Sequence, residues 1–281
     1  MSNPILISTA AYDGHGLPTA LEEISGLGLS LVELAFIEGY TDPFTEDFFS
    51  RVNADTIVSL LEKNRLTCLS FSAHMDLSQD SAVDVFKRRM EFAKRVGATY
   101  IISNAGPRQK ETAFVNNMRK LAVVAANLNM IIALENPGDG RENIIDSAKA
   151  CADIIEAIGS DFVRVNYDFG NLMSHLFGKV RPEEDYRLAL AQTAHYHIKD
   201  VAPDSSGWHF TEIGKGAIDY KRILVEVAAD AGQKPLSLEI PLRITRAGDG
   251  SPRRAASPVD LKKIREVMAG SLSFVKAALS S

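Results

Sequence analysis

Short apolar runs alternate with longer amphipathic stretches along the whole chain of 281 residues, and this alternation limits the fold more than any other feature. Each run is nearly continuous, as expected for a parallel strand that is covered on both faces. The stretches between the runs have apolar residues at helical spacing. The eight runs span residues 5–9, 31–34, 68–72, 100–103, 131–135, 163–168, 196–199 and 236–239. The alternation predicts an α/β fold with a parallel sheet.

The stretches between the runs are predicted to be helices. They span residues 19–26, 54–64, 83–96, 111–127, 144–158, 182–192, 220–231 and 258–279. Gly97 follows the third of them as a C-cap, and Pro182 and Pro258 suit first-turn positions. Eight units of about 35 residues each fit a closed (β/α)8 barrel better than an open doubly wound sheet. Because no Gly- or Pro-rich linker divides the chain, we expect a single TIM-barrel domain over residues 1–281.

Composition excludes several classes of protein. Hydrophobic residues make up 46% of the chain and charged residues 24%, which excludes disorder, collagen and a coiled coil. The formal net charge of -5 argues against nucleic acid as a partner. The N-terminus lacks the basic segment of a signal peptide, and the longest apolar run is too short to span a bilayer, so we expect a cytoplasmic protein without membrane contact. Cys68 and Cys151 are expected to be buried free thiols.

Five of the apolar runs end in a side chain that can bind a metal or move a proton. These side chains are His74, Glu135, Asp168, His197 and Glu239. Because the carboxyl ends of barrel strands converge on one mouth, we expect all five in one pocket.

An ionised glutamate at the end of a buried strand is costly unless it is paired or bound to a metal. Glu135, Asp168, His197 and Glu239 together offer oxygen and nitrogen ligands, and we predict that they hold a divalent metal. This ligand set suits Mn²⁺ or Mg²⁺ best, with Zn²⁺ or Co²⁺ as further candidates. Salt bridges from the glutamates to a neighbouring lysine or arginine are the alternative interpretation.

The seventh run contains two histidines. His195 and His197 alternate with Tyr196, so both face the same side of the strand, and His197 is favoured as the ligand because it lies nearer the mouth. Lys199 and Asp200 follow, and they either contact the substrate or form a surface pair. His74 is either a substrate contact or a hydrogen-bonded histidine of the barrel wall.

Three further segments carry weaker signals. The Gly-x-Gly in residues 213–220 does not directly follow a strand, which favours a tight loop before a helix over a phosphate-binding loop. Trp208 and His209 form either a lid, from which His209 would contact the substrate, or a packed loop. Arginines cluster in residues 243–257, beyond the last run, where barrels often bind phosphate. We expect Arg243 or Arg246 to contact an anionic group of the substrate, and a solvated loop is the alternative.

Short motifs recur in a fixed order along the chain. They are VEL at 32–34, LEN at 134–136, NYDFG at 166–170, HYHIKD at 195–200, IGKGAIDY at 213–220 and LE at 238–239. In order and spacing they resemble the xylose-isomerase-like TIM-barrel superfamily, which comprises sugar (phosphate) isomerases and epimerases and also endonuclease-IV-type proteins.

The resemblance implies an activity and a cofactor. It implies a divalent metal, Mn²⁺ first, held by the four predicted ligands, and a sugar, keto-sugar or sugar phosphate as substrate. In the ketose 3-epimerases of this family the two glutamates act as an acid–base pair on opposite faces of the substrate. Carried over, Glu135 and Glu239 would exchange the proton α to a carbonyl, and the metal would stabilise the enediolate. The resemblance also implies a homo-oligomer, a dimer or a tetramer.

The chain departs from the family pattern at two positions. Many relatives have a histidine where this chain has Asn171, and the epimerases have a substrate-binding arginine where it has Pro203. Asn171 can still hydrogen-bond a sugar hydroxyl, and we count it with Asn104 among the candidate substrate contacts.

Three other functions compete with an isomerase or epimerase. A dehydratase of the inosose or dehydroshikimate type would use the same metal to acidify an α-proton and then expel a β-hydroxyl. A DNA-repair enzyme of the endonuclease IV type needs several more histidines than the six in this chain. A non-catalytic barrel that serves as a partner subunit would bind no metal.

Overall fold

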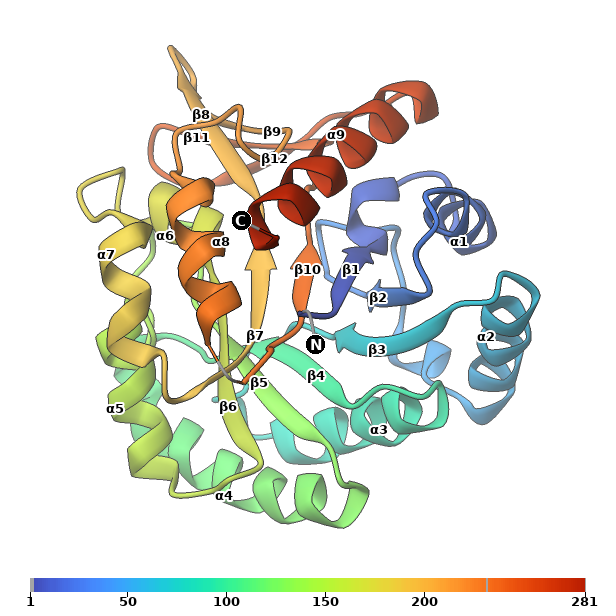
Figure 1. Cartoon of the computed structure of the whole chain (residues 1–281). Coiled ribbons are helices and arrows are strands. Elements are labelled where there is room, and N and C mark those ends of the chain that lie inside the picture. Colours follow the sequence, from blue (N-terminus) through green and yellow to red (C-terminus); the bar gives the residue numbers. More distant parts are fainter. Residues whose placement is uncertain (1–2, 231, 281) are drawn as a thin grey trace.

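The computed structural model describes residues 3–230 and 232–280. Within them, eight parallel strands close into a barrel in the order β1-β10-β7-β6-β5-β4-β3-β2 (Figure 1). The barrel strands are β1 (Ile5–Ser8), β2 (Leu31–Ala35), β3 (Thr67–Ser72), β4 (Tyr100–Asn104), β5 (Ile131–Glu135), β6 (Val163–Asp168), β7 (Thr193–Ile198) and β10 (Leu236–Leu238). The predicted TIM barrel is confirmed, and each predicted run forms one of its strands.

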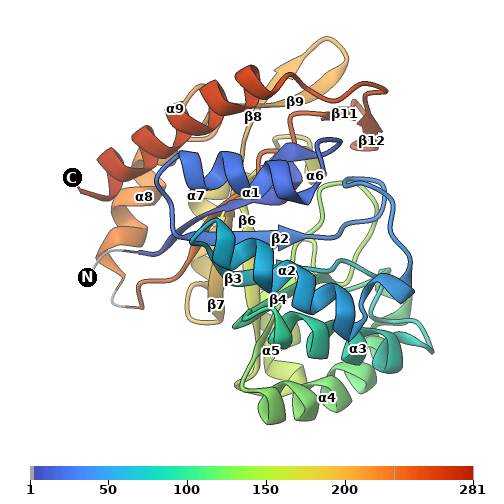
Figure 2. The same ribbon diagram turned by 90° about the vertical axis from the view of Figure 1, so that its right-hand side faces the viewer.

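Helices surround the barrel and bury their apolar faces against it (Figures 1 and 2). They are α1 (Leu17–Gly26), α2 (Arg51–Lys63), α3 (Ala82–Arg95), α4 (Glu111–Leu128), α5 (Ala148–Ile158), α6 (Phe169–His175), α7 (Pro182–Asp185), α8 (Tyr220–Ala229) and α9 (Leu261–Leu279). Short 3-10 helices span Thr9–Tyr12, Glu46–Phe48, Arg108–Lys110 and Tyr186–Ala189. Local sequence sets several helix ends: the hydroxyls of Ser50 and Ser147 cap α2 and α5.

Several predicted helix boundaries were wrong. The expected helix over residues 182–192 is only α7 followed by a 3-10 turn, and α5 begins at Ala148 because Ser147 caps it. Pro258 is not in a first turn, since the carboxylate of Asp260 caps α9. Pro182 does occupy the first turn of α7, as predicted. The predicted end of the seventh helix, Ala231, lies outside the described residues.

A small antiparallel sheet was missed by the sequence analysis. It has the order β12-β11-β9-β8 and consists of β8 (Asp200–Asp204), β9 (Gly207–Thr211), β11 (Ile244–Ala247) and β12 (Pro252–Arg254). Residues 243–257 were expected to be a loop, and Trp208 and His209 a lid or a packed loop. Prolines and polar residues interrupt the apolar pattern of both segments. The sheet lies beyond the carboxyl ends of β7 and β10 and so borders the mouth of the barrel (Figures 1 and 2).

Strand register brings the polar strand ends together. Asn104 of β4 is opposite Glu135 of β5, and Glu135 is in turn opposite Asn166 of β6. Asp168 of β6 is opposite His197 of β7. Four neighbouring strands therefore deliver their polar residues to one end of the barrel.

The two cysteines are buried and free, as predicted. Burial raises the pKa of the Cys68 thiol to about 12 and raises the pKa of Cys151 as well. Both side chains therefore act as small apolar groups of the core. No helix in the described part of the chain is long and apolar enough to cross a membrane.

Candidate active site

The structure brings the four predicted metal ligands together. Glu135, Asp168 and His197 lie at or near the ends of β5, β6 and β7, and Glu239 directly follows β10. One ligand atom from each residue lies within 4.8 Å of the others, and all four side chains are buried. Residues more than a hundred positions apart thus form one cluster at the carboxyl end of the barrel.

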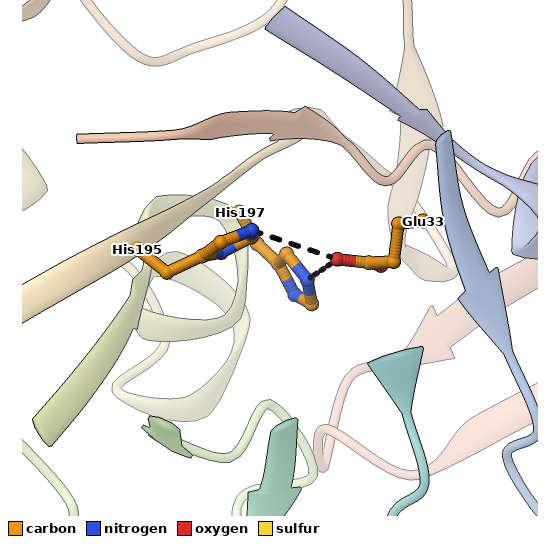
Figure 3. A group of neighbouring side chains, drawn as sticks. All are labelled: Glu33, His195 and His197. Atoms are coloured by element: carbon orange, nitrogen blue, oxygen red, sulfur yellow. Dashed lines mark hydrogen bonds and ion pairs between the residues drawn. The ribbon is translucent and has the colours of Figure 1, made fainter. Parts of the chain in front are cut away.

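The ring of His197 lies between three carboxylates on one side and one carboxylate on the other. Its Nδ1 faces Glu135 Oε2 at 3.0 Å, Glu239 Oε2 at 3.4 Å and Asp168 Oδ2 at 3.7 Å. Its Nε2 lies 3.0 Å from Glu33 Oε2 on the other side. Figure 3 shows Glu33, from β2, reaching across the barrel interior to this ring.

The carboxylate of Glu33 is fully buried and well satisfied. Ser70 donates to its Oε2 at 2.9 Å and Ser72 to its Oε1 at 3.2 Å. Burial opposes ionisation of Glu33, but the charge and hydrogen bond of His197 outweigh it and lower the pKa to about 2. An ionised carboxylate only accepts hydrogen bonds, so His197 Nε2 must be the donor. The proton of a neutral His197 then sits on Nε2, and the lone pair of Nδ1 points at the cluster.

His195 has a different role from His197, although both face the barrel interior as predicted. Its Nδ1 lies 2.8 Å from Asn166 Oδ1, and Asn166 uses its amide nitrogen to donate to Glu135 Oε2 at 3.1 Å. Nδ1 of His195 must therefore donate. Burial lowers the pKa of His195 to about 3, so the ring is neutral and its Nε2, 3.8 Å from Glu33, carries no proton.

The cluster fits a divalent cation. Asp168 Oδ2 and His197 Nδ1 are buried without a hydrogen bond among the described residues. The charged groups beside Asp168 Oδ2 are Lys199 Nζ at 2.7 Å and the His197 ring at 3.7 Å. Among the described residues, four buried carboxylates, those of Glu33, Glu135, Asp168 and Glu239, lie around the His197 ring, and Lys199 is the only buried lysine. Buried negative charge is costly unless positive charge compensates it. A divalent cation bound by the carboxylates and the imidazole would supply that positive charge.

Without a metal cation, bound protons and the ammonium of Lys199 balance the negative charge of the carboxylates. Burial opposes the charged form of His197, but the charges of Glu239, Glu33 and Glu135 raise its pKa well above the usual range. Burial raises the pKa of Glu239, whereas His197 and His74 more than offset burial at Glu135 and lower its pKa. A cation at His197 Nδ1 would displace a proton from this group.

Lys199 is buried among the carboxylates and does not form a surface pair. Its Nζ lies 2.7 Å from Asp168 Oδ2 and 2.5 Å from Glu239 Oε2. Tyr220 fixes its backbone, because the phenol donates to the Lys199 carbonyl at 2.8 Å. The ammonium therefore bridges two of the predicted metal ligands.

The Gly-x-Gly loop binds the carboxylate of Asp200. This buried carboxylate accepts hydrogen bonds from the backbone N–H groups of Gly214, Gly216 and Ile218. A Cβ at Gly216 would meet Val201 O at 2.7 Å, so only glycine allows this close approach. The loop wraps a carboxylate of its own chain and leads into α8, which confirms the predicted tight loop.

A cavity of about 520 Å³ opens over the cluster. Glu135 and Glu239 line it, and so do four of the predicted substrate contacts: His74, Asn104, Asn171 and Lys199. His74 Nε2 lies 3.2 Å from Glu135 Oε2, and Asn171 donates to Glu135 Oε1 at 2.7 Å. The space is large enough for a monosaccharide or its phosphate.

Two predicted substrate contacts do not line the cavity. His209 lies on β9, where it is exposed and its Nδ1 is 3.3 Å from Asp204 Oδ2. The guanidinium of Arg243 donates to Asp13 and to the carbonyls of Ala255 and Ala256. His209 is thus held by a partner in its own hairpin, and Arg243 by Asp13 and by the segment that follows β12.

Two residues of the site were missed or left undecided by the sequence analysis. Glu33 was noted only as part of a family motif, and Arg246 only as an alternative to Arg243. The signal for Glu33 was present, because a glutamate inside an apolar strand needs a buried partner. No sequence signal shows that Arg246, and not Arg243, lines the cavity, because their positions depend on the antiparallel sheet that was not predicted.

Comparison with known families fits this architecture. A family model described as a xylose isomerase-like TIM barrel matches residues 21–266. The chain belongs to this family.

Solved structures support the same fold. A xylose isomerase domain protein from Planctomyces limnophilus is 18% identical, with a TM-score of 0.76 over 99% of this chain and 98% of that one. D-psicose 3-epimerase from Clostridium cellulolyticum H10 is 16% identical, with a TM-score of 0.75 over 98% and 99%. A probable 3-DHS dehydratase from Bacillus anthracis is 15% identical, with a TM-score of 0.68 over 94% and 98%. A comparison with curated protein sequences finds no match.

Proposed function

We propose that the protein is a metal-dependent isomerase or epimerase of a sugar, keto-sugar or sugar phosphate. The observation that carries the proposal is the position of Glu135 and Glu239: both belong to the predicted metal cluster and both line the cavity. Two carboxylates beside one metal suit transfer of a proton α to a carbonyl. The similarity of the fold to sugar epimerases supports a carbohydrate as substrate.

Glu135, Asp168, His197 and Glu239 would hold the metal. When bound, a divalent metal polarises the carbonyl and hydroxyl oxygens of a keto-sugar and so acidifies the adjacent C–H bond. Mn²⁺ is our first candidate, because hard carboxylate oxygens outnumber nitrogen in the ligand set.

The protein side chains would move the proton. One of the two glutamates removes the proton from the carbon next to the carbonyl, and the electron pair moves to the carbonyl oxygen to give an enediolate. The other glutamate returns a proton to the opposite face of that carbon in an epimerisation. Asn171 holds Glu135 by its hydrogen bond at 2.7 Å, and Lys199 holds Glu239, so both carboxylates are oriented before substrate binds.

Isotope exchange tests this reaction. The Mn²⁺-loaded protein is incubated in D₂O with a panel of keto-sugars and keto-sugar phosphates, and the recovered sugars are analysed by mass spectrometry. We expect deuterium at the carbon α to the carbonyl without loss of water. Loss of water with enone absorbance would favour the dehydratase instead, and no exchange with any of the sugars would contradict the proposal.

Glu33 provides a test of metal binding alone. Replacing it by glutamine removes the negative charge beside His197 Nε2 and leaves one acceptor oxygen for the three donors Ser70, Ser72 and His197. We therefore expect Mn²⁺ to bind about 10- to 100-fold more weakly in calorimetry. Glu62→Gln, on the exposed face of α2, is the matched control and should bind Mn²⁺ like the unmodified protein. Equal Mn²⁺ affinity in Glu33→Gln and the control would contradict the role of Glu33.

A further inference from the structure

Arg246 is a buried cation that pairs with no carboxylate among the described residues. It lies on β11 and is only 4% exposed. Its Nη2 donates to Asn171 Oδ1 at 3.3 Å and its Nη1 to Gly250 O at 3.4 Å, both long bonds. Its Nε has no hydrogen-bond partner, and no carboxylate of the described residues lies within 4.0 Å of the guanidinium.

Another buried arginine of this protein has partners that balance its positive charge. Arg89 is 6% exposed, donates from Nε to Glu46 at 3.2 Å and also reaches the Ala73 and His74 carbonyls. Because a buried charge without a partner is costly, the contrast indicates that the partner of Arg246 is not part of the chain.

The guanidinium borders the candidate active site. Arg246 lines the same cavity as Glu135 and Glu239, and it lies over the ring of Tyr40 at 5.5 Å from the ring centroid. Asn171 joins it to the reacting region, because the same amide donates to Glu135 and accepts from Arg246. A group bound at Arg246 would therefore belong to the molecule whose proton Glu135 transfers.

The backbone is shaped to let the guanidinium approach. A Cβ at Gly138 would lie 2.7 Å from Arg246 Nη2, so a side chain there would displace it. Two carboxylates of the outer cavity wall have partners of their own: Asp76 accepts from Ser78, and Asp139 from the backbone N–H of Arg141. Arg246 thus keeps its donors available to a ligand.

We propose that Arg246 binds an anionic group, a carboxylate or a phosphate, of the substrate. The proposal rests on the proposed function, because it treats the cavity as the sugar site, and it narrows the substrate class to acidic sugars or sugar phosphates. The planar fork of a guanidinium suits two-point contact with either anion.

Three keto-hexose probes separate the candidate ligands. D-fructose, D-fructose 6-phosphate and D-fructuronate share one carbon skeleton and differ in charge at the far end. Calorimetry with the Mn²⁺-loaded protein should give at least about tenfold tighter binding of one anionic probe than of D-fructose. The tighter of the two anionic probes identifies phosphate or carboxylate as the group. If neither binds more tightly than D-fructose, the proposal is wrong.

Replacing Arg246 tests whether this residue causes the preference for an anionic probe. Arg246→Met should weaken binding of the preferred anionic probe by about 10- to 100-fold and leave D-fructose and Mn²⁺ binding within about twofold. Arg253→Met removes an exposed positive charge from the neighbouring strand β12 and should change neither. An unchanged affinity of Arg246→Met for the anionic probe would overturn the assignment.

These outcomes are separate from the exchange experiment. An anion preference without deuterium exchange would leave Arg246 as the anchor and reject the proposed reaction. Deuterium exchange without an anion preference would support the proposed reaction and reject the role of Arg246. Should Arg246→Met be unstable, the ranking of the three probes by the unmodified protein still decides the proposal.

Discussion

Replacing Glu239 by glutamine is expected to lower by about a thousandfold the rate of α-proton exchange in the epimer whose C–H bond faces this carboxylate. An amide cannot accept the proton, and it is a weaker metal ligand than a carboxylate. Exchange into keto-sugars in D₂O measures the effect, at Mn²⁺ concentrations that saturate the variant so that metal loss is not mistaken for loss of the base. Glu135→Gln is expected to have the same effect on the opposite epimer, because the two carboxylates face opposite sides of one carbon.

The control for this prediction is again Glu62→Gln, which changes the same functional group far from the cavity. A Glu239→Gln variant that keeps exchange in both epimers within about tenfold of the unmodified protein at saturating Mn²⁺ would show that Glu239 is not an acid or base. Binding of a non-reacting sugar should change much less than exchange, because the role of Glu239 is assigned to the chemical step.

Much of the fold and of the candidate metal cluster could be predicted from the sequence. Strands of a covered parallel sheet are continuous apolar runs, so a polar residue at the end of a run is conspicuous, as at Glu135 and Asp168. The closure of the barrel then brings such ends together whatever their separation in sequence. Strand alternation also predicted correctly that His195 and His197 share a face.

The parts that depend on contacts between distant loops could not be predicted. Arg243 and Arg246 look equivalent in the sequence, yet Arg243, directly before β11, meets Asp13, and Arg246, on β11, faces the cavity. The sheet that separates them has short strands with Pro203 and Pro252 in them, which gives no period-two apolar pattern. Glu33 likewise becomes part of the site only because β2 and β7 face each other across the barrel.

Asp13 is expected to be a major source of stability for the mouth of the barrel. Its carboxylate is buried and accepts from Arg254 at 2.6 and 2.7 Å and from Arg243 at 3.2 Å. It joins the segment after β1 to the hairpin of β11 and β12. Asp13→Ala leaves the largely buried Arg243 without a carboxylate, so we expect the free energy of unfolding in urea to fall by about 3 kcal/mol.

Asp55→Ala is the matched control for this loss. Asp55 also pairs with an arginine, Arg95, at 2.6 Å, but its side chain is 54% exposed, and an exposed pair contributes less than about 1 kcal/mol. Mn²⁺ affinity of folded Asp13→Ala should stay unchanged, because Asp13 lies outside the metal cluster and the cavity lining. Equal unfolding free energies for the two variants would mean that the Asp13 pairs stabilise the mouth no more than a surface ion pair does.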